Sequence, residues 1–172
     1  PVDPRKFSIT REIFLEDKNI EAKIKDMLSK KTKFVKLKVG AGIDKDRAAI
    51  STVNRISKNR LKIRIDANRA YDIENAVILA LWAKDNNVIL FEEPIDGDFS
   101  QISKFREQSG MPVMLDESIQ TIDSLKKAIA AKCFDVLNVK LTRLGGITPA
   151  RKYINLCQKS GIGVYLGCSE EL

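Results

Sequence analysis

The sequence of 172 residues contains no histidine. Without an imidazole, the chain has no Ser-His-Asp or Cys-His nucleophile system, and it offers no histidine ligand to a metal ion. Acid–base chemistry must therefore come from carboxylates, lysines or tyrosines. A metal ion, if one is used, must be held by oxygen atoms, which favours hard cations.

Cysteines and long apolar runs are also scarce. Of the three cysteines, Cys133 and Cys157 lie in helix-like stretches, and with Cys168 they have no metal-like spacing. We expect Cys133 and Cys157 to be small buried side chains, and we expect the protein to work in a reducing, cytoplasmic setting. No apolar run reaches the roughly 18 residues of a membrane span, so we expect no membrane partner. Residues 1–5 lack Met and a signal-peptide pattern, which indicates a fragment or a trimmed chain.

Positive charge is in excess, with 30 Lys and Arg against 23 Asp and Glu, a net charge of +7. Such an excess raises the question of nucleic-acid binding. Much of it lies near one helix and its exit, at Lys23, Lys25, Lys30, Lys31 and Lys33. Only Phe34 adds an aromatic ring there, and no nucleic-acid motif occurs. We therefore interpret the run as a solvated basic face and expect no nucleic-acid partner.

Short aliphatic or β-branched runs alternate with helical patterns along the chain. Strands are expected at 6–14, 34–39, 61–66, 88–91, 113–115, 136–141 and 164–166. Helices are expected at 17–29, 44–57, 73–82, 99–108, 121–131 and 148–159. This alternation is typical of parallel pairing through right-handed crossovers, in either a (β/α) barrel or an open doubly wound sheet.

The regular spacing favours the barrel, because each unit repeats without a topological switch. In addition, no glycine-rich phosphate fingerprint follows the first strand. The predicted fold class is therefore α/β, a TIM-type (β/α) barrel. A complete barrel has eight units and about 250 residues, whereas this chain has about seven units. We expect residues 1–172 to form one incomplete catalytic barrel domain without an eighth strand. Its exposed strand edges would favour association into a homo-oligomer.

Charged residues recur at the ends of five of these strands. Lys38, Asp66, Glu92, Asp116 and Lys140 follow one another at steps of 28, 26, 24 and 24 residues. Each step is about the length of one strand plus one return helix. Because active sites of barrels lie where the carboxyl ends of the strands meet, we expect these side chains to converge.

Alternation along the second strand adds one residue to this group. Successive side chains of a strand point to opposite faces. With Val35, Leu37 and Val39 facing the helices, Lys36 and Lys38 both point into the barrel.

Three carboxylates on consecutive units, Asp66, Glu92 and Asp116, would repel one another in a partly dry site. Mg²⁺ relieves that repulsion because it prefers oxygen ligands in octahedral geometry. A lysine near a metal and another cation can have its pKa lowered enough to act as a base. We therefore predict Mg²⁺ on the three carboxylates, a neutral lysine that removes a proton beside a substrate carboxylate, and an opposite lysine that returns one.

Each of these residues alone has a simpler interpretation. Segment 116–118, Asp-Glu-Ser before a helix, is a natural capping sequence. Lys36 and Lys38 alone are typical of a blunted edge strand. The prediction therefore rests on the joint order and spacing of all five strand ends.

Together, the motifs Lys-x-Lys, Asp-Ala-Asn, Phe-Glu-Glu-Pro, Asp-Glu-Ser and Asn-Val-Lys-x-x-x-x-Gly-Gly resemble the enolase superfamily. The similarity is to its muconate lactonizing subgroup, which includes dipeptide epimerases, and it covers roughly residues 5–170. The absence of histidine agrees with that subgroup and disagrees with the mandelate racemase type, which uses a His-Asp pair. The resemblance implies the metal ligands Asp66, Glu92 and Asp116, the base Lys38, the acid/base Lys140, the stabilising Lys36, and supporting roles for Asn68, Glu117 and Asn138.

The resemblance also implies an activity, which is Mg²⁺-dependent isomerisation of a small-molecule carboxylate. Epimerisation of a dipeptide of the L-Ala-D/L-Glu type is the leading expectation. The alternatives are an o-succinylbenzoate synthase, an N-acylamino acid racemase or a muconate cycloisomerase of the same subgroup, and an inactive barrel fragment.

Two motifs depart from the family, and two of its parts have no counterpart here. Segment 165–171 resembles the Gly-Cys-Met-x-Glu-Ser of many dipeptide epimerases, but the Met is absent and the Glu comes one place early. Segment 66–71 has Ala-Tyr where Gly-Trp is frequent, which affects a loop. The family's capping domain and eighth strand both contact substrate. We therefore expect weak or no activity from this chain alone.

Overall fold

A computed structural model of the protein describes residues 10–13 and 19–168. In this part of the chain, the strands form one parallel sheet in which each pairs with its neighbour in sequence. The strands are β1 (Thr10–Ile13), β2 (Phe34–Lys38), β3 (Lys62–Asp66), β4 (Val88–Glu92), β5 (Val113–Leu115), β6 (Val136–Lys140) and β7 (Gly163–Gly167). The helices are α1 (Ile20–Ser29), α2 (Ile43–Ser57), α3 (Ile73–Lys84), α4 (Phe99–Ser109), α5 (Ile122–Ala130) and α6 (Ile147–Lys159).

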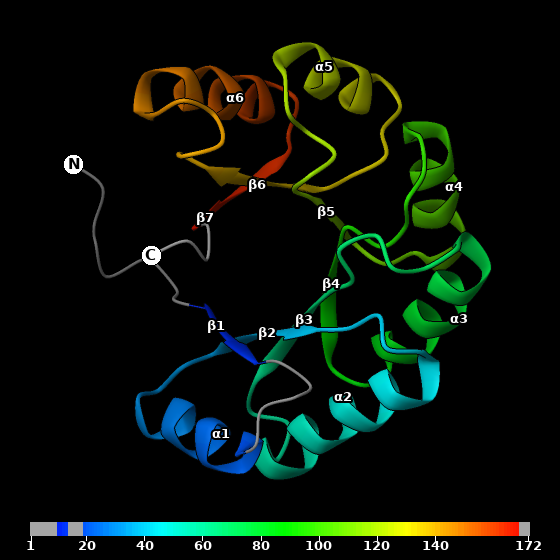
Figure 1. Cartoon of the computed structure of the whole chain (residues 1–172), viewed down its shortest axis with the longest axis vertical. Helices are drawn as coiled ribbons and strands as arrows, with labels where there is room; N and C mark the ends of the chain where they lie inside the picture. Colours follow the sequence, from blue (N-terminus) through cyan, green and yellow to red (C-terminus); the bar gives the residue numbers. More distant parts are fainter. Residues whose placement is uncertain (1–9, 14–18, 169–172) are drawn as a thin grey trace.

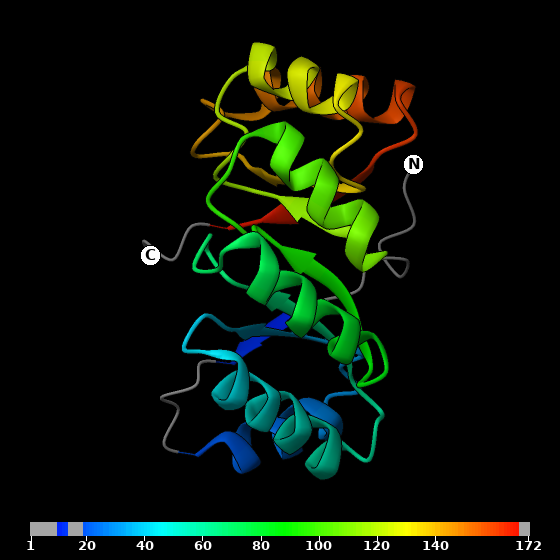
Figure 2. The same cartoon turned by 90° about the vertical axis from the view of Figure 1, so that its right-hand side faces the viewer.

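The sheet curves into a ring with its helices on the outside (Figure 1). Strands β1 and β7 both lie on the left of that view, and β2 and β6 lie on opposite sides of the ring. In the turned view the helices follow one another in chain order, and α1 to α4 each pack against the next (Figure 2). The predicted incomplete (β/α) barrel is therefore confirmed.

The elements lie close to the ranges expected from the sequence. Of the strand expected at 6–14, only residues 10–13 are described. Residues 17 and 18 of the first expected helix also lie outside the described residues. Helix α2 and helix α6 each begin one residue earlier than expected, at Ile43 and Ile147, directly after glycines with positive φ.

Strand alternation follows the predicted direction on β2. Val35 and Leu37 are fully buried against the helix layer, whereas Lys36 and Lys38 are only partly buried. On the outer side of β4, Phe91 packs edge-on against Phe105 of α4, with ring centroids 5.6 Å apart. Burial of such side chains, each worth about 1.5–3 kcal/mol, attaches every helix to the sheet and leaves the charged side chains on the inner face.

Two simpler interpretations of the charged segments are excluded by the fold. Helix α5 begins at Ile122, and Thr121 caps it by accepting a hydrogen bond from the backbone N–H of Ser124. Segment 116–118 therefore ends a strand and does not cap the helix. Strand β2 pairs with both β1 and β3, so Lys36 and Lys38 do not lie on an edge strand.

The cysteines and the basic run fit the expectations with one correction. Cys133 and Cys157 are fully buried, and burial raises the pKa of their thiols to about 12 and about 11. Cys157 lies in α6, but Cys133 lies outside any helix, because the chain turns at Lys132 with φ 52° before entering β6. Lys30, directly after α1, forms an ion pair with Asp26 four residues earlier. Lys25 forms the same kind of pair with Glu21 on this helix.

Candidate active site

The three predicted metal ligands end neighbouring strands. Asp66 is the last residue of β3, Glu92 is the last residue of β4, and Asp116 follows β5 directly. The register pairs Asp66 with Glu92, so the two carboxylates leave the sheet at the same level. All three residues are at most 1% exposed. Such burial is costly for carboxylates unless cations neutralise them.

Lys36 neutralises two of these carboxylates. Its Nζ lies 2.6 Å from Oδ2 of Asp66 and 3.2 Å from Oε2 of Glu92. Burial alone would lower the pKa of Lys36, but the Glu92 and Asp66 carboxylates outweigh burial and raise it. The side chain therefore remains an ammonium at neutral pH, which suits a role in stabilising negative charge and excludes a role as a base in this arrangement.

Lys38 lies on the other side of Asp66. Its Nζ donates hydrogen bonds to Oδ2 of Asp66 at 2.8 Å and to Oδ1 of Asn68 at 2.7 Å. The amide of Asn68 in turn donates to Oε1 of Glu117 at 2.5 Å. Burial opposes ionisation of Asp66, yet Lys36 and Lys38 together lower its pKa. Asn68 therefore contacts Lys38 directly, and Glu117 contacts Asn68.

Lys140 lies across the ring at the end of β6. Its Nζ is 2.7 Å from Oδ2 of Asp116. The second oxygen of Asp116 forms an ion pair with Arg143, whose guanidinium also donates to the backbone carbonyl of Asn138 at 3.2 Å. Asp116 is therefore held between two cations that come from the end of β6 and the loop after it.

Glu92 is held by an amide from β6. Nδ2 of Asn138 donates to Oε1 of Glu92 at 2.7 Å, and the other oxygen of Glu92 is buried and accepts no hydrogen bond. Burial raises the pKa of Glu92, and the neighbouring Asp66 adds to that effect. Lys36 opposes the rise but does not cancel it. Oε2 of Glu92 thus lies near the cations of Lys36 and Arg64, at 3.2 and 3.6 Å, without a hydrogen bond.

Three site residues were not identified from the sequence. Glu12 of β1 lies 3.7 Å from both Lys36 and Lys38, and Arg64 of β3 lies 3.6 Å from Glu92. Alternation offered a signal for Arg64, which is two residues before Asp66 on the same strand face. Arg143 lies in a loop, where no periodic signal exists.

The donor set suits a hard divalent cation. Carboxylate oxygens are the ligands that Mg²⁺ prefers, and three of them end successive strands. Across residues 10–13 and 19–168, no three acidic or cysteine side chains meet closely enough to hold a metal ion. Lys36 lies between Asp66 and Glu92, and Lys140 contacts Asp116. The three carboxylates therefore have the chemistry of ligands for a divalent cation. In this structure lysine side chains neutralise their negative charges.

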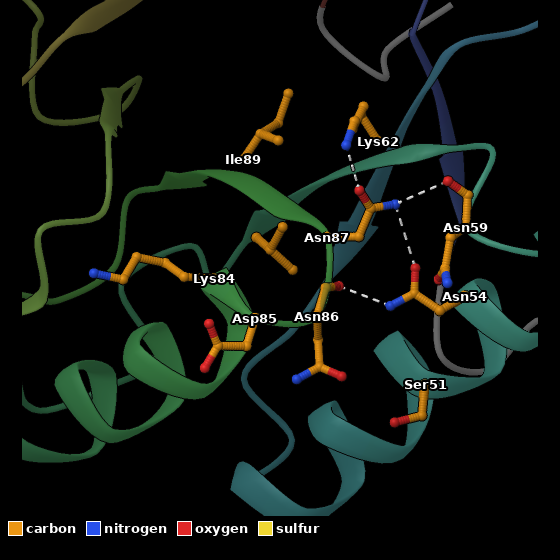
Figure 3. A pocket seen from close by; sticks show the side chains of 10 residues that line it. Ser51, Asn54, Asn59, Lys62, Lys84, Asp85, Asn86, Asn87 and Ile89 are labelled. Carbon is orange, nitrogen blue, oxygen red and sulfur yellow. Dashed lines mark hydrogen bonds between the residues drawn. The ribbon is translucent and has the colours of Figure 1, made fainter.

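A separate cavity of about 610 Å³ lies at the amino ends of β3 and β4. Its polar groups are already bonded to one another: Lys62 donates to Asn87 at 2.7 Å, and Asn54 donates to the carbonyl of Asn86 at 2.7 Å (Figure 3). In TIM-type barrels the active site lies at the carboxyl ends of the strands, whereas residues at the amino ends, where this cavity lies, contribute to stability.

The described part of the chain has no helix with the length and apolar character needed to cross a membrane.

A curved parallel sheet with charged groups at its carboxyl ends defines a TIM-type barrel with a candidate active site. The chain belongs to the Enolase C-terminal domain-like family, whose model matches residues 19–172. The resemblance to the enolase superfamily stated from the motifs is therefore confirmed.

Several characterised proteins are similar to this chain. A hydrophobic dipeptide epimerase of Enterococcus faecalis is 30% identical over 138 residues, which cover 80% of this chain and 39% of that protein. An N-succinyl-L-Arg/Lys racemase of Bacillus cereus is 27% identical over 168 residues, covering 96% and 46%. The crystal structure of the dipeptide epimerase from E. faecalis V583 superposes with a TM-score of 0.88 and 27% identity, covering 96% of this chain and 49% of that one. The chain thus spans less than half the length of these relatives.

Proposed function

We propose that this chain is the barrel domain of a divalent-metal-dependent isomerase that epimerises a dipeptide of the L-Ala-D/L-Glu type. The observation that carries the proposal is the position of Lys38 and Lys140, on strands β2 and β6 at opposite sides of the ring (Figure 1). Inversion at a carbon requires a base on one face and an acid on the other. Similarity to dipeptide epimerases and to an amino acid racemase supports this chemistry.

The proton transfer uses the two lysines in different protonation states. Nζ of a neutral Lys38 takes the proton from the carbon next to the substrate carboxylate. The C–H bond breaks, and its electron pair stays on the substrate as an enolate-type anion. The ammonium of Lys140 then gives a proton to the opposite face of the same carbon. Exchange with solvent resets both lysines, and the reverse reaction exchanges their roles.

Lys36 stabilises the anion in this proposal. Its side chain is 14% exposed, and its ammonium lies between Asp66 and Glu92. A cation fixed before the reaction stabilises developing negative charge without reorganisation, and it does so more strongly where water is excluded.

Asp66, Glu92 and Asp116 would hold the divalent cation, which we propose to be Mg²⁺. Such a cation, when bound, polarises the substrate carboxylate and stabilises the charge that develops on it. Binding of the cation would replace the ion pairs that Lys38 forms with Asp66 and that Lys140 forms with Asp116. The same exchange frees Lys38 and Lys140 from their carboxylate partners for proton transfer.

Exchange of the substrate α-proton for deuterium tests this function. The chain, expressed within its complete open reading frame and supplied with Mg²⁺, is incubated in D₂O with a library of dipeptides. We expect deuterium at one α-carbon, and we expect Lys38→Ala and Lys140→Ala each to abolish inversion. An absence of exchange from every dipeptide and every N-acylated amino acid would refute the proposal and favour an inactive barrel.

A second candidate is racemisation of an N-succinyl or other N-acylated amino acid. It is favoured by the Bacillus cereus racemase, whose similarity extends over 96% of this chain. The same two lysines would perform it, so the variants above do not separate the candidates. Exchange with N-succinyl amino acids but not with dipeptides would identify this activity, and product analysis would also reveal a dehydration or a cycloisomerisation.

A further inference from the structure

Glu93, directly after Glu92 of β4, has an unusual backbone and a fully buried side chain. Its φ of 40° lies in the left-handed region, which costs energy for a residue with a Cβ. Its carboxylate is 0% exposed. In the described part of the chain, the ion pairs of Lys36, Lys38 and Lys140 do not include Glu93, whose carboxylate pairs with Arg69.

The carboxylate of Glu93 bonds two loops that belong to other strands. Oε1 accepts hydrogen bonds from the backbone N–H groups of Asp116 at 2.7 Å and Ser118 at 2.8 Å. Oε2 accepts from the Ser118 hydroxyl at 2.7 Å and from Nε of Arg69 at 3.3 Å. Arg69 also donates to Oγ of Ser118 at 3.3 Å, which closes the group.

Backbone hydrogen bonds join the same loops at Glu93. Its N–H donates to the carbonyl of Met114 at 3.0 Å, and its carbonyl accepts from the N–H of Arg69 at 2.8 Å. Main-chain and side-chain bonds therefore both run from Glu93 to the ends of β3 and β5. The loop after β3 begins at Asp66, and the loop after β5 begins at Asp116.

We infer that Glu93 is a positioning residue that fixes the three strand ends carrying Asp66, Glu92 and Asp116 at one spacing. This inference deepens the proposed function and rests on it for the role of the three carboxylates. Groups that orient metal-binding side chains typically change metal affinity by about 10- to 100-fold when mutated. A carboxylate suits position 93 because it accepts four hydrogen bonds, whereas an amide would turn a donor toward Arg69 or the two N–H groups.

The test compares Mn²⁺ binding, measured by electron paramagnetic resonance, in Glu93→Gln, Glu93→Ala and the unmodified protein. We expect affinity to fall severalfold in Glu93→Gln and about tenfold or more in Glu93→Ala. Asp135→Asn is the matched control, because Asp135 also accepts from an arginine and from a backbone N–H but lies before β6, at the other end of the sheet. It should lower the melting temperature and leave Mn²⁺ affinity unchanged.

Hydrogen exchange separates failure of this inference from failure of the proposed function. If the unmodified protein binds no Mn²⁺, the metal proposal fails, and the amide exchange rates of Asp116 and Ser118 decide the role of Glu93. We expect both amides to exchange faster in Glu93→Gln and Glu93→Ala and to keep their rates in Asp135→Asn. Unchanged Mn²⁺ affinity in a folded Glu93→Ala variant, or unchanged exchange where no metal binds, overturns the inference.

Discussion

Asn138 donates a hydrogen bond across the ring to Glu92, with 2.7 Å between Nδ2 and Oε1. The contact is possible because the neighbouring residue of β7 is a glycine: a Cβ on Gly167 would lie 2.2 Å from Oδ1 of Asn138. A side chain at position 167 therefore competes for the space of the Asn138 amide. The glycine before Cys168 thus acts through Asn138 on a predicted metal ligand.

Gly167→Ala should displace the Asn138 amide and leave Oε1 of Glu92 without its donor. Loss of a buried hydrogen bond to a carboxylate costs about 1.5–3 kcal/mol, so the urea midpoint should fall accordingly. Gly163→Ala on the same strand is the control, because its Cβ would meet Val136 at an ordinary 3.4 Å. Equal stability losses in the two variants would contradict the role of Gly167.

Lys36→Met should destabilise the protein by about 3–5 kcal/mol at neutral pH, because it leaves Asp66 and Glu92 buried without their shared cation. The raised pKa of Glu92 would rise further, so the folded state would bind a proton more readily than the unfolded chain. Stability of the variant should therefore increase as the pH falls from 8 to 5. Denaturant unfolding at several pH values measures this trend, and a decrease toward pH 5 steeper than in the unmodified protein would contradict it.

Asp66→Asn, Glu92→Gln and Asp116→Asn should each weaken Mn²⁺ binding by more than tenfold, because each removes one anionic ligand of the proposed site. Isothermal titration calorimetry measures the affinity. Asp123→Asn, which removes an exposed charge from the first turn of α5, is the control and should bind Mn²⁺ as before. Wild-type affinity in all three variants would rule out the proposed ligands.

Asp135→Asn should reduce stability by about 1–2 kcal/mol after allowance for partial exposure, through loss of its paired hydrogen bonds with Arg106. Burial opposes ionisation of Asp135, but Arg106 and the Val113 N–H lower its pKa below the unfolded value. Its contribution is therefore present at neutral pH and is lost as the pH falls below about 4. Thermal melts at pH 7 and pH 3 should differ less in the variant than in the unmodified protein.

The sequence predicted the fold and most of the site because the signals are periodic. The spacing from Lys38 to Lys140 located five strand ends, and alternation along β2 placed Lys36 correctly on the inner face. These predictions depend on backbone geometry that repeats in every unit. The family model then confirmed the superfamily, whereas the roles of the individual side chains remain predictions.

The site residues that the sequence did not reveal depend on contacts between different strand–helix units. Glu12 is level with Lys36 only because of the β1–β2 register, which alternation within one strand does not specify. Arg143 reaches Asp116 from a loop. The predicted helical position of Cys133 was wrong because α5 ends three residues earlier, at Ala130, and the chain then turns at Lys132, which has a left-handed backbone.

The strand order has a consequence for how the chain is made. Each strand from β2 to β7 pairs with the strand that precedes it in sequence, at a separation of about one strand–helix unit. A strand leaving the ribosome therefore finds its partner already synthesised, and the sheet can grow in the direction of translation. Pairing between consecutive units closes shorter loops than pairing between distant strands would, which favours folding unit by unit. The carboxylates of the site would then be brought together one after another, in the order in which they are translated.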